Sequence, residues 1–317
     1  MIVVCGEALM DLVAEGDVLR PLVGGGPFNT AVALGRLGVP VAFLGRLSTD
    51  RFGDRLATRL AESGVDARLL LRGDEPTPLA VVHVGPEGEA DYRFYLEGTA
   101  ERAITSATLP ALPAEAAALH LGTMSLATEP AASAFAALAL REARRRLVVL
   151  DPNVRPAVVT DRRTYLARLE RLLRRAHVVR LSEADAAWLF PGRPLDEVIA
   201  ALLGLSVRLV AVTRGPGPAM AATPRLTIEV TPPPVEIIDT VGAGDAFNAG
   251  LLAGLWERGR MSPEGVGRLG RDDLTAAMGL GVTAAALTCA RAGAASPSRA
   301  EVDAARGPVA SASLSER

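Results

Sequence analysis

A glycine-rich turn between two aspartates, DTVGAGDAFNAG, holds residue types suited to chemistry on an anion. Gly242, Ala243 and Gly244 allow backbone N–H groups to approach a ligand, and the helical pattern that follows adds a partial positive charge at its N-terminus. These three residues therefore predict an anion hole that needs no lysine. Asp245 comes next, and a carboxylate beside a bound phosphate makes sense if it takes a proton from the attacking hydroxyl. The alternative is that Asp245 only caps a helix after a flexible turn.

A second glycine cluster, GGGPFNTAVALGRLG, starts at Gly24 and leads into a helical pattern. Gly25 permits close approach of the backbone to a ligand, and Asn29 offers a donor and an acceptor to sugar hydroxyls. A tight turn into a helix that Asn29 caps is the alternative. Asp11 lies just past the first expected strand, at the sheet edge where ligands gather, and it is either a hydroxyl acceptor or a turn residue.

The segment LDPNVRP places Asp151, Asn153 and Arg155 directly after another apolar strand. A guanidinium at that edge predicts a clamp for phosphate or for a sugar substituent, so we expect Arg155 in the catalytic set. Asn153 is expected among the substrate contacts. The alternative for the whole segment is a structural Pro-Asn turn.

Composition excludes several functional classes. The 317 residues carry a formal net charge of −2, which gives no electrostatic case for nucleic acid as a partner. The chain has no lysine, so a P-loop kinase and Schiff-base enzymes, which need a lysine amine, are excluded. Two cysteines form no disulfide framework, no apolar stretch is long enough for a bilayer, and the N-terminus lacks a basic signal region. We therefore expect a cytoplasmic protein without a membrane partner.

Short apolar runs alternate with amphipathic helical patterns along most of the chain. This alternation predicts an α/β fold with a mostly parallel central sheet covered by helices on both faces, in a single domain. Strands are expected at residues 2–5, 41–45, 118–123, 147–151, 177–182 and 207–213. Helices are expected at residues 28–37, 52–62, 130–145, 162–175 and 195–203, with long helical patterns after Gly242 and Asp272.

Two extended segments interrupt the alternation. Residues 79–84 and 90–96 flank the polar turn GPEGE and predict a β-hairpin, and residues 10–23 are extended without a helical period. Residues 10–23 and 79–97 therefore predict a small β-sheet lid, with an ordinary edge hairpin as the alternative. Residues 306–317 predict a flexible tail.

Together these motifs resemble the PfkB or ribokinase-like family of sugar kinases, and the resemblance runs from GEALMD to CARAGA. The two glycine signatures, in the family's order, carry it. The resemblance implies a ribokinase-like three-layer α/β/α fold with a small β-sheet lid. It also implies an enzyme that uses ATP and Mg²⁺ to phosphorylate the primary hydroxyl of a small sugar.

The resemblance assigns roles to single residues. Asp245 matches the family's catalytic base, and Gly242, Ala243 and Gly244 match its anion hole. Sugar-contact positions fall on Asp11, Gly25 and Asn29.

Nucleotide and cation positions also follow from the resemblance. Thr213 and Gly215 in VTRGPG resemble the strand-end motif near the nucleotide phosphates. The family's N-x-x-E element, linked to Mg²⁺ and phosphate, becomes SEAD here, with Asp185 in place of the longer Glu. An activating monovalent cation, K⁺, is expected on Asp239 and on the backbone carbonyls of Arg291 and Gly293.

The expected substrate is fructose. Ribokinases usually carry a lysine where this chain has Gly26, and GEALMDLV, GGGPFN and YRFYLEGTA are more similar to the fructokinase branch. A 2-keto-3-deoxygluconate kinase, which shares GEAL and DPN-x-R, and a ribokinase-type pentose kinase are the alternatives. A sugar acid needs extra positive charge, which Arg93 or Arg155 would supply, and we include Arg93 among the substrate contacts. On a regular strand, however, Arg93 points away from the face that Tyr92 and Phe94 share.

Two other functional classes fit less well. A dinucleotide-dependent dehydrogenase needs G-x-G-x-x-G after the first strand, where this chain has VVCGEALMD. A non-catalytic sugar-binding relative would be free to lose its base, whereas Asp245 and the anion hole are both present. We therefore expect a kinase whose partners are a sugar and ATP, and a homodimer formed through the lid.

Overall fold

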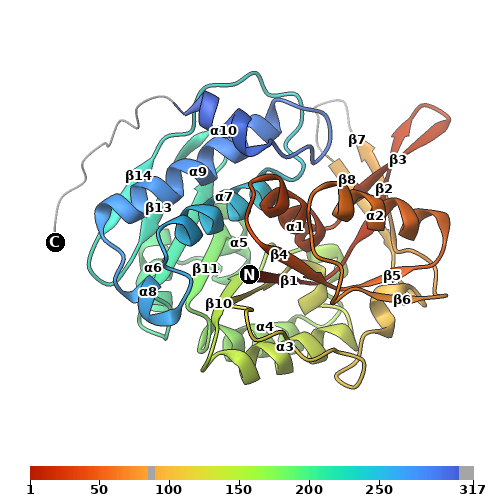
Figure 1. The fold of residues 1–317 in the computed structure, drawn as a ribbon, viewed down its shortest axis with the longest axis horizontal. Coiled ribbons are helices and arrows are strands. Elements are labelled where there is room, and N and C mark those ends of the chain that lie inside the picture. Colours follow the sequence, from red (N-terminus) through yellow and green to blue (C-terminus); the bar gives the residue numbers. More distant parts are fainter. Residues whose placement is uncertain (85–89, 307–317) are drawn as a thin grey trace.

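The computed structural model describes residues 1–84 and 90–306. A large sheet runs through the middle of the molecule (Figure 1). Its parallel strands are β1 (Ile2–Cys5), β4 (Val41–Leu44), β9 (Ala118–Gly122), β10 (Leu147–Asp151), β11 (Val178–Ser182) and β12 (Leu209–Arg214). Two antiparallel strands, β13 (Gly217–Ala222) and β14 (Thr227–Val230), extend one edge. The order across the sheet is β14-β13-β12-β11-β10-β9-β1-β4.

The central strands are continuous apolar runs because helices cover both faces of the sheet. Every residue of β1 is buried, and β1 pairs in parallel with both β4 and β9. The six parallel strands that the alternation predicts are confirmed. The pair β13–β14 was not predicted, since Gly217, Pro218 and Ala219 have low strand propensity.

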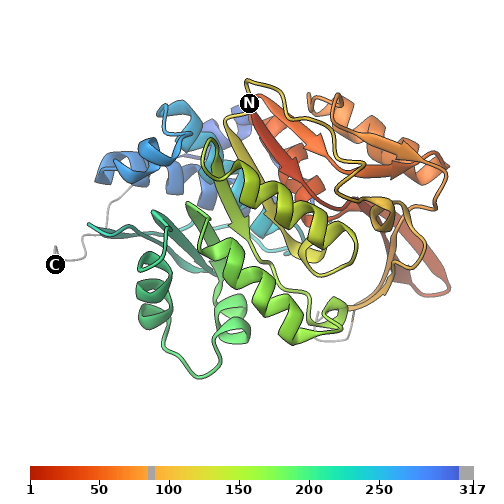
Figure 2. The same ribbon diagram turned by 90° about the horizontal axis from the view of Figure 1, so that it is seen from below.

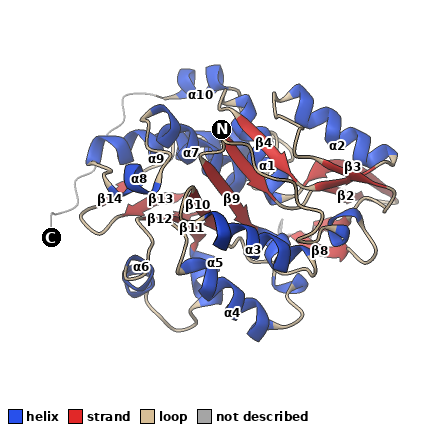
Figure 3. Cartoon of the chain, turned by 60° about the horizontal axis from the view of Figure 1, so that its bottom comes forward, coloured by secondary structure: helices blue, strands red, loops and turns tan. Residues whose placement is uncertain are grey.

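Helices form a layer on each face of the sheet (Figure 3). The predicted helices are confirmed with shifts of a few residues at their ends, and a further helix, α5 (Glu183–Leu189), begins in the SEAD motif, for which no helix was predicted. One layer contains α1 (Gly26–Arg36), α7 (Ala243–Glu257), α8 (Pro263–Gly267), α9 (Arg271–Cys289) and α10 (Arg299–Ala305), with α2 (Arg51–Glu62) beside it. The other layer contains α3 (Ala131–Glu142), α4 (Arg162–Leu173), α5 (Glu183–Leu189) and α6 (Leu195–Leu203). The fold is therefore the expected ribokinase-like three-layer α/β/α arrangement.

A separate sheet of four strands stands at one end of the molecule and is called the lid here (Figures 1 and 2). Its strands, in spatial order, are β3 (Val18–Gly24), β2 (Leu9–Glu15), β7 (Leu79–Val84) and β8 (Ala90–Tyr95). The two extended segments thus meet in one sheet, with β2 parallel to β7. The GPEGE turn and the expected tail beyond Arg306 lie outside the described residues.

A short parallel pair, β5 (Arg46–Ser48) and β6 (Leu71–Gly73), completes the strands of the described chain. None of the helices described above is long and apolar enough to cross a membrane.

Candidate active site

Two cavities meet at the N-terminus of α7. The first, about 850 Å³, lies between the inner face of the lid and the segments that follow β1, β9 and β10, and is called the lid cavity. The second, about 770 Å³, lies between the end of β12, the segment 231–237 and α9, and is called the apolar cavity. Both cavities are lined by Arg180, Ser182, Ile237, Thr240 and Gly244. Two ligands, one in each cavity, would therefore face each other beside Gly244.

Asp245 lies in the first turn of α7, buried, and lines the lid cavity. The amide Nδ2 of Asn29 donates a hydrogen bond to its Oδ2 at 2.9 Å. Burial raises the pKa of Asp245 to about 7; the Asn29 hydrogen bond opposes this shift and the nearby charge of Asp151 adds to it. A carboxylate with a pKa near neutrality is suited to accept a proton from a hydroxyl.

The turn before Asp245 exposes backbone N–H groups. Gly242 caps α7 with φ 76°, in the left-handed region that favours glycine, and a Cβ there would lie 2.6 Å from the Cβ of Ala294. The N–H groups of the first helical turn, including those of Gly244 and Asp245, have no intrahelical carbonyl to bind. With the helix dipole they form a site for an oxyanion at the junction of the two cavities.

Arg180 is a residue at this junction that our sequence reasoning missed. Its guanidinium is buried, pairs with Asp151 at 3.2 Å and donates to Oγ1 of Thr213 at 2.7 Å. A Cβ on Gly244 would lie 2.8 Å from that guanidinium, so Arg180 sits directly against the glycine turn. The available signal was an arginine inside the apolar strand HVVRLS, because a buried charge needs a partner or a ligand.

The expected sugar contacts converge on the lid cavity. Asp11, Gly25, Asn29, Asn153 and Arg155 all line it. Burial raises the pKa of Asp11 to about 6, with Arg155 opposing the shift. A carboxylate, two amides and a guanidinium offer several hydrogen bonds to adjacent hydroxyls.

One wall of the lid cavity is aromatic. Tyr92 and Phe94 of β8 are stacked, with ring centroids 5.8 Å apart and planes 10° from parallel, and both line the cavity. Two other residues of the cavity lining, Thr123 (φ 56°) and Asn153 (φ 37°), adopt left-handed backbone conformations that are uncommon outside glycine. Such outliers cluster at functional sites.

The structure does not bring Arg93 to this cavity. Alternate residues of a strand face opposite sides, and Tyr92 and Phe94 take the cavity side, so Arg93 lies exposed on the outer face of the lid. The expectation that Arg93 contacts the substrate is corrected accordingly. Arg20 of β3 lines the cavity instead, and the sequence carried no signal for it.

Asp185 also departs from its expected place. It forms the capping box of α5, in which its Oδ2 accepts from N and Oγ of Ser182, and its Oδ1 accepts from the N–H of Val154 at 2.7 Å. Both oxygens are therefore used, and the buried carboxylate lines neither cavity. Asp185 fixes the DPNV segment, while its neighbour Glu183 lines the apolar cavity.

Thr213 and Gly215 line the apolar cavity, as expected of residues near a nucleotide. The rest of its wall was not predicted, because apolar side chains on a helix look like core residues in a sequence. This wall contains Pro232, Pro233, Pro234, Val235, Phe247, Val282, Ala285 and Ala286.

The expected cation residues lie together behind Gly242. The carboxylate of Asp239 accepts from the N–H of Val241 at 2.9 Å and from the N–H of Gly293 at 2.8 Å. Gly293 thus presents its N–H to Asp239, while its carbonyl accepts from Ala295 at 2.8 Å. The Arg291 side chain turns away to pair with Glu301. Among residues 1–84 and 90–306, no group of three or more His, Cys, Asp or Glu side chains is placed to hold a metal ion.

Comparison with known proteins decides the family. Residues 1–301 match the model of the pfkB family of carbohydrate kinases. The chain belongs to this family. It is 39% identical over 260 residues to a fructokinase of Rhizobium leguminosarum bv. trifolii, which covers 80% of this chain and 79% of the relative.

Solved structures agree with the family. The fructokinase of Xylella fastidiosa with bound ATP superposes with a TM-score of 0.87 at 28% identity, covering 96% of this chain and 97% of that one. A double mutant of the fructokinase from Vibrio cholerae O395, bound to fructose, ADP and a potassium ion, gives a TM-score of 0.84 at 28% identity, with coverage of 96% and 97%. The protein is an ATP-dependent carbohydrate kinase.

Proposed function

We propose that this kinase transfers the γ-phosphoryl group of ATP to the primary hydroxyl of fructose. The observation that carries the proposal is the meeting of the lid cavity and the apolar cavity at the N-terminus of α7, beside Asp245. A sugar in the lid cavity and a nucleotide in the apolar cavity would have their reacting groups at that point.

Asp245 acts as the general base in this proposal. Its carboxylate takes the proton of the primary hydroxyl, the hydroxyl oxygen forms a bond to the γ-phosphorus, and the bond from phosphorus to the bridging oxygen breaks. ADP leaves with that electron pair. The N–H groups at Gly242–Gly244 and the guanidinium of Arg180 stabilise the charge on the transferring group, and Arg155 clamps the substrate at the other side.

Fructose fits the lid cavity for three reasons. A Cβ on Gly26 would lie 2.5 Å from Cγ2 of Thr123 and 3.3 Å from Oδ1 of Asp245, so the sugar can approach a bare backbone next to the base. Asp11 and Asn29 offer partners to its hydroxyls. The stacked rings beside them cover the apolar face of a sugar and exclude water. The similar proteins that carry the name fructokinase support the same choice.

A sugar acid is the second candidate, because Arg155 lines the lid cavity and so does Arg20, which also pairs with Glu15 at 2.7 Å. Competition kinetics with fructose, ribose and 2-keto-3-deoxygluconate test the assignment. We expect the highest kcat/KM for fructose. A higher value for 2-keto-3-deoxygluconate would assign the protein to the sugar-acid branch, and a higher value for ribose to the pentose branch.

Mg²⁺ would enter with ATP, because it is held mainly by substrate phosphates, water and one or two carboxylates. Glu183 lines the apolar cavity, is more than half exposed and lies 3.5 Å from Arg214, so it is the carboxylate nearest to the bound phosphates in this proposal, whereas Asp185 lines neither cavity and accepts three hydrogen bonds from the protein. When bound, the ion would neutralise negative charge on the phosphates. Since ATP and Mg²⁺ are supplied inside the cell, we place the protein in the cytoplasm.

We also propose a K⁺ site formed by Asp239 and the carbonyls near Arg291 and Gly293. The two hydrogen bonds that Asp239 accepts, from the N–H groups of Val241 and Gly293, support it, because the carboxylate links the segment of the anion hole to the segment of the expected carbonyls. The double mutant of the V. cholerae fructokinase whose crystal structure holds a potassium ion supports it too. Rates measured in KCl, NaCl and tetramethylammonium chloride should be highest in KCl. Equal rates in all three salts would refute the cation.

A homodimer through the lid completes the proposal. The outer face of the lid and its tip expose large apolar side chains, with Leu19 at 47%, Val18 at 65% and Tyr95 at 56% exposure. A second copy would cover them. Sedimentation velocity should give a dimer for the wild type and a monomer for Tyr95→Arg; a monomeric wild type would refute the assembly.

A further inference from the structure

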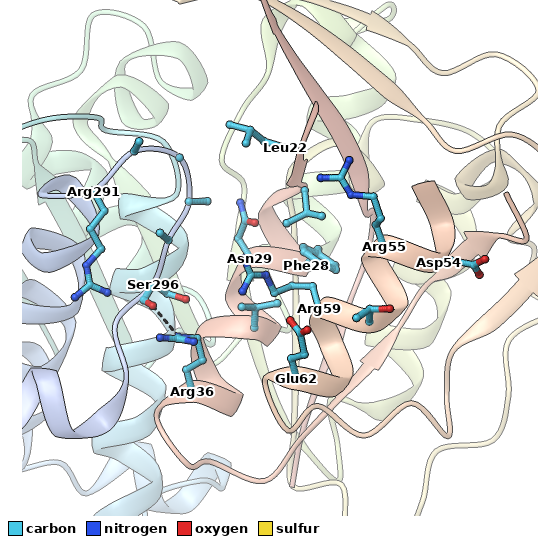
Figure 4. Close-up of a pocket in the computed structure, with 17 residues that line it drawn as sticks. Leu22, Phe28, Asn29, Arg36, Asp54, Arg55, Arg59, Glu62, Arg291 and Ser296 are labelled. Atoms are coloured by element: carbon cyan, nitrogen blue, oxygen red, sulfur yellow. Dashed lines mark hydrogen bonds between the residues drawn. The ribbon is translucent and has the colours of Figure 1, made fainter. Parts of the chain in front are cut away.

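A third cavity, about 550 Å³, lies between α1, α2 and the segment 291–296, outside the two cavities of the proposed reaction (Figure 4). Four arginine side chains line it, so it is called the arginine cavity here. They are Arg36, Arg55, Arg59 and Arg291. Figure 4 shows Arg59 extending from α2 into the space between α2 and the segment that carries Ser296.

The carboxylates near this cavity do not balance its arginines. Arg291 pairs with Glu301 at 2.6 Å, and Arg36 lies 4.0 Å from the same carboxylate, so two guanidinium groups share one negative charge. Arg59 makes no ion pair or side-chain hydrogen bond to any residue in the ranges 1–84 and 90–306. Arg59 is an exposed residue that lines the cavity, and its positive charge has no partner within the described part of the chain.

The lining also contains two acidic residues, but they do not cancel the excess positive charge of the arginines. Asp54 is already paired with Arg72 at 2.6 Å. Glu62 is exposed at the C-terminal end of α2 and is the remaining carboxylate of the lining. The cavity therefore carries net positive charge.

Ser296 gives an independent indication of a ligand. Its residue exposure is 6%, it lines the arginine cavity, and its hydroxyl has no hydrogen-bond partner among the described residues. The backbone carbonyl of Ser296 is held by Nε of Arg36 at 2.8 Å, which fixes the segment. A buried hydroxyl without a partner is unfavourable unless a ligand or water satisfies it.

Both walls of the arginine cavity continue to the catalytic centre. Asn29 lines this cavity as well as the lid cavity, and it donates the hydrogen bond to Asp245. On the other wall, Ala294 packs directly behind Gly242 of the anion hole. A ligand that joins the two walls would therefore fix the position of the anion hole relative to its base.

We propose that the arginine cavity binds a small phosphate monoester, which activates the enzyme from outside the active site. Guanidinium groups bind phosphate oxygens through paired, charge-assisted hydrogen bonds, and Arg59 lines the cavity from α2 while Ser296 lines it from the segment 291–296. The bound monoester holds the segment 291–296 against α2, keeps Ala294 behind Gly242 and raises kcat.

Calorimetric titration with glycerol 3-phosphate tests the site, with a saturating non-hydrolysable ATP analogue present to fill the anion hole. Arg59→Gln removes the unpaired guanidinium, and Arg51→Gln, an exposed residue of the same helix outside the cavity, is the matched control. We expect Arg59→Gln to weaken binding about ten-fold or more, and Arg51→Gln to bind as the wild type does. Inorganic phosphate as a second probe separates recognition of the phosphate from recognition of the ester.

Kinetics test the coupling. Glycerol 3-phosphate should raise kcat in the wild type and in Arg51→Gln but not in Arg59→Gln, whose rate without the ester should match the wild type. Equal binding by the two variants, or no binding by the wild type, would overturn the site. Binding that depends on Arg59 but leaves kcat unchanged would overturn the activation. Ser296→Ala, which keeps every charge, should weaken binding less than Arg59→Gln.

Discussion

The lid cavity and the apolar cavity differ in what they offer a ligand. The lid cavity gathers directional polar groups from separate elements, including Asp11 from the lid, Asn29 from α1 and Asp245 from α7. The apolar cavity presents mainly flat surface from three consecutive prolines and from α9. Directional hydrogen bonds distinguish one sugar from another, whereas an apolar slot accepts a planar base by its area. Substrate specificity should therefore depend on the lid side, and nucleotide affinity on the other.

Replacing Asp245, the proposed base, should have the largest effect on activity, because Asp245 lies where the two cavities meet and where the phosphoryl transfer is proposed to occur. Asp245→Asn keeps size and hydrogen bonding but removes basicity, so kcat should fall by about 10²–10⁴-fold. The KM for ATP should change little, since the backbone N–H groups remain. Steady-state kinetics measure both, with Asp272→Asn in the first turn of α9 as the control. If most of the turnover survives, Asp245 is only a helix cap.

The same variant has a stability signature. Burial raises the pKa of Asp245 from 3.8 to about 7, so the folded protein keeps a proton that the unfolded chain loses between these values. The contribution of this group to stability therefore falls as pH rises from about 4 to about 7 and stays low above that. Asp245→Asn should have a higher Tm than the wild type at about pH 8, and the difference should vanish at about pH 4. A variant less stable at both pH values would contradict the burial of an ionisable carboxyl here.

The second-largest loss of activity should come from Gly26→Ala, a substitution that affects only the lid cavity. The added methyl group of Gly26→Ala would lie 2.5 Å from Cγ2 of Thr123 and 3.2 Å from Nδ2 of Asn153. Displacing the sugar by a fraction of an ångström from Asp245 should lower kcat/KM for fructose by about 10²-fold while leaving the KM for ATP unchanged. Gly267→Ala, whose methyl group meets open space, is the control. An equal loss on both substrates would mean that the two cavities are not independent.

The reciprocal change acts on the apolar side. Ala285 of α9 lines the apolar cavity, and Ala285→Leu would fill part of it. We expect the KM for ATP to rise about ten-fold, with the KM for fructose unchanged. Ala276→Leu, on the same helix outside the cavity, should leave both constants alone. A rise in the KM for fructose instead would place the sugar, not the nucleotide, in the apolar cavity.

The contrast between the cavities also explains what the sequence revealed. Alternating apolar runs and helical periods predicted the parallel strands and most helices, because burial on both faces leaves a clear pattern. Polar residues next to expected strands and glycine turns, such as Asp11, Asn153 and Asp245, were predicted for the site in the same way, although Asp11 lies within β2 and Asp245 in the first turn of α7. The apolar wall of Val282, Ala285 and Ala286 did not, because its residues resemble those of any packed helix.

Other parts of the site depend on contacts that no local pattern encodes. Arg180 reaches the anion hole only because β11 ends next to the start of α7, and Arg20 reaches the lid cavity only through the pairing of β3 with β2. Asp185 was expected near the nucleotide, but a capping box and a bond to Val154 hold it elsewhere. The outward position of Arg93 could be predicted from the sequence, because alternate residues of a strand face opposite sides and its neighbours Tyr92 and Phe94 face the cavity.

The smallest expected effect lies within the lid cavity itself and concerns how Asn29 tunes the base. Its amide donates to Asp245 at 2.9 Å and lowers the pKa of that carboxyl, against the upward shift from burial. Asn29→Ala should therefore move the acidic limb of the pH profile of kcat/KM to higher pH, so that activity at about pH 6 falls several-fold more than activity at about pH 8. Asn153→Gly is the matched control, because it removes an amide from the same cavity, allows the left-handed backbone at that position and touches no bond to Asp245. If kcat/KM of Asn29→Ala falls equally at both pH values, Asn29 only holds the sugar. The lid cavity would then differ from the apolar cavity only in which ligand it binds.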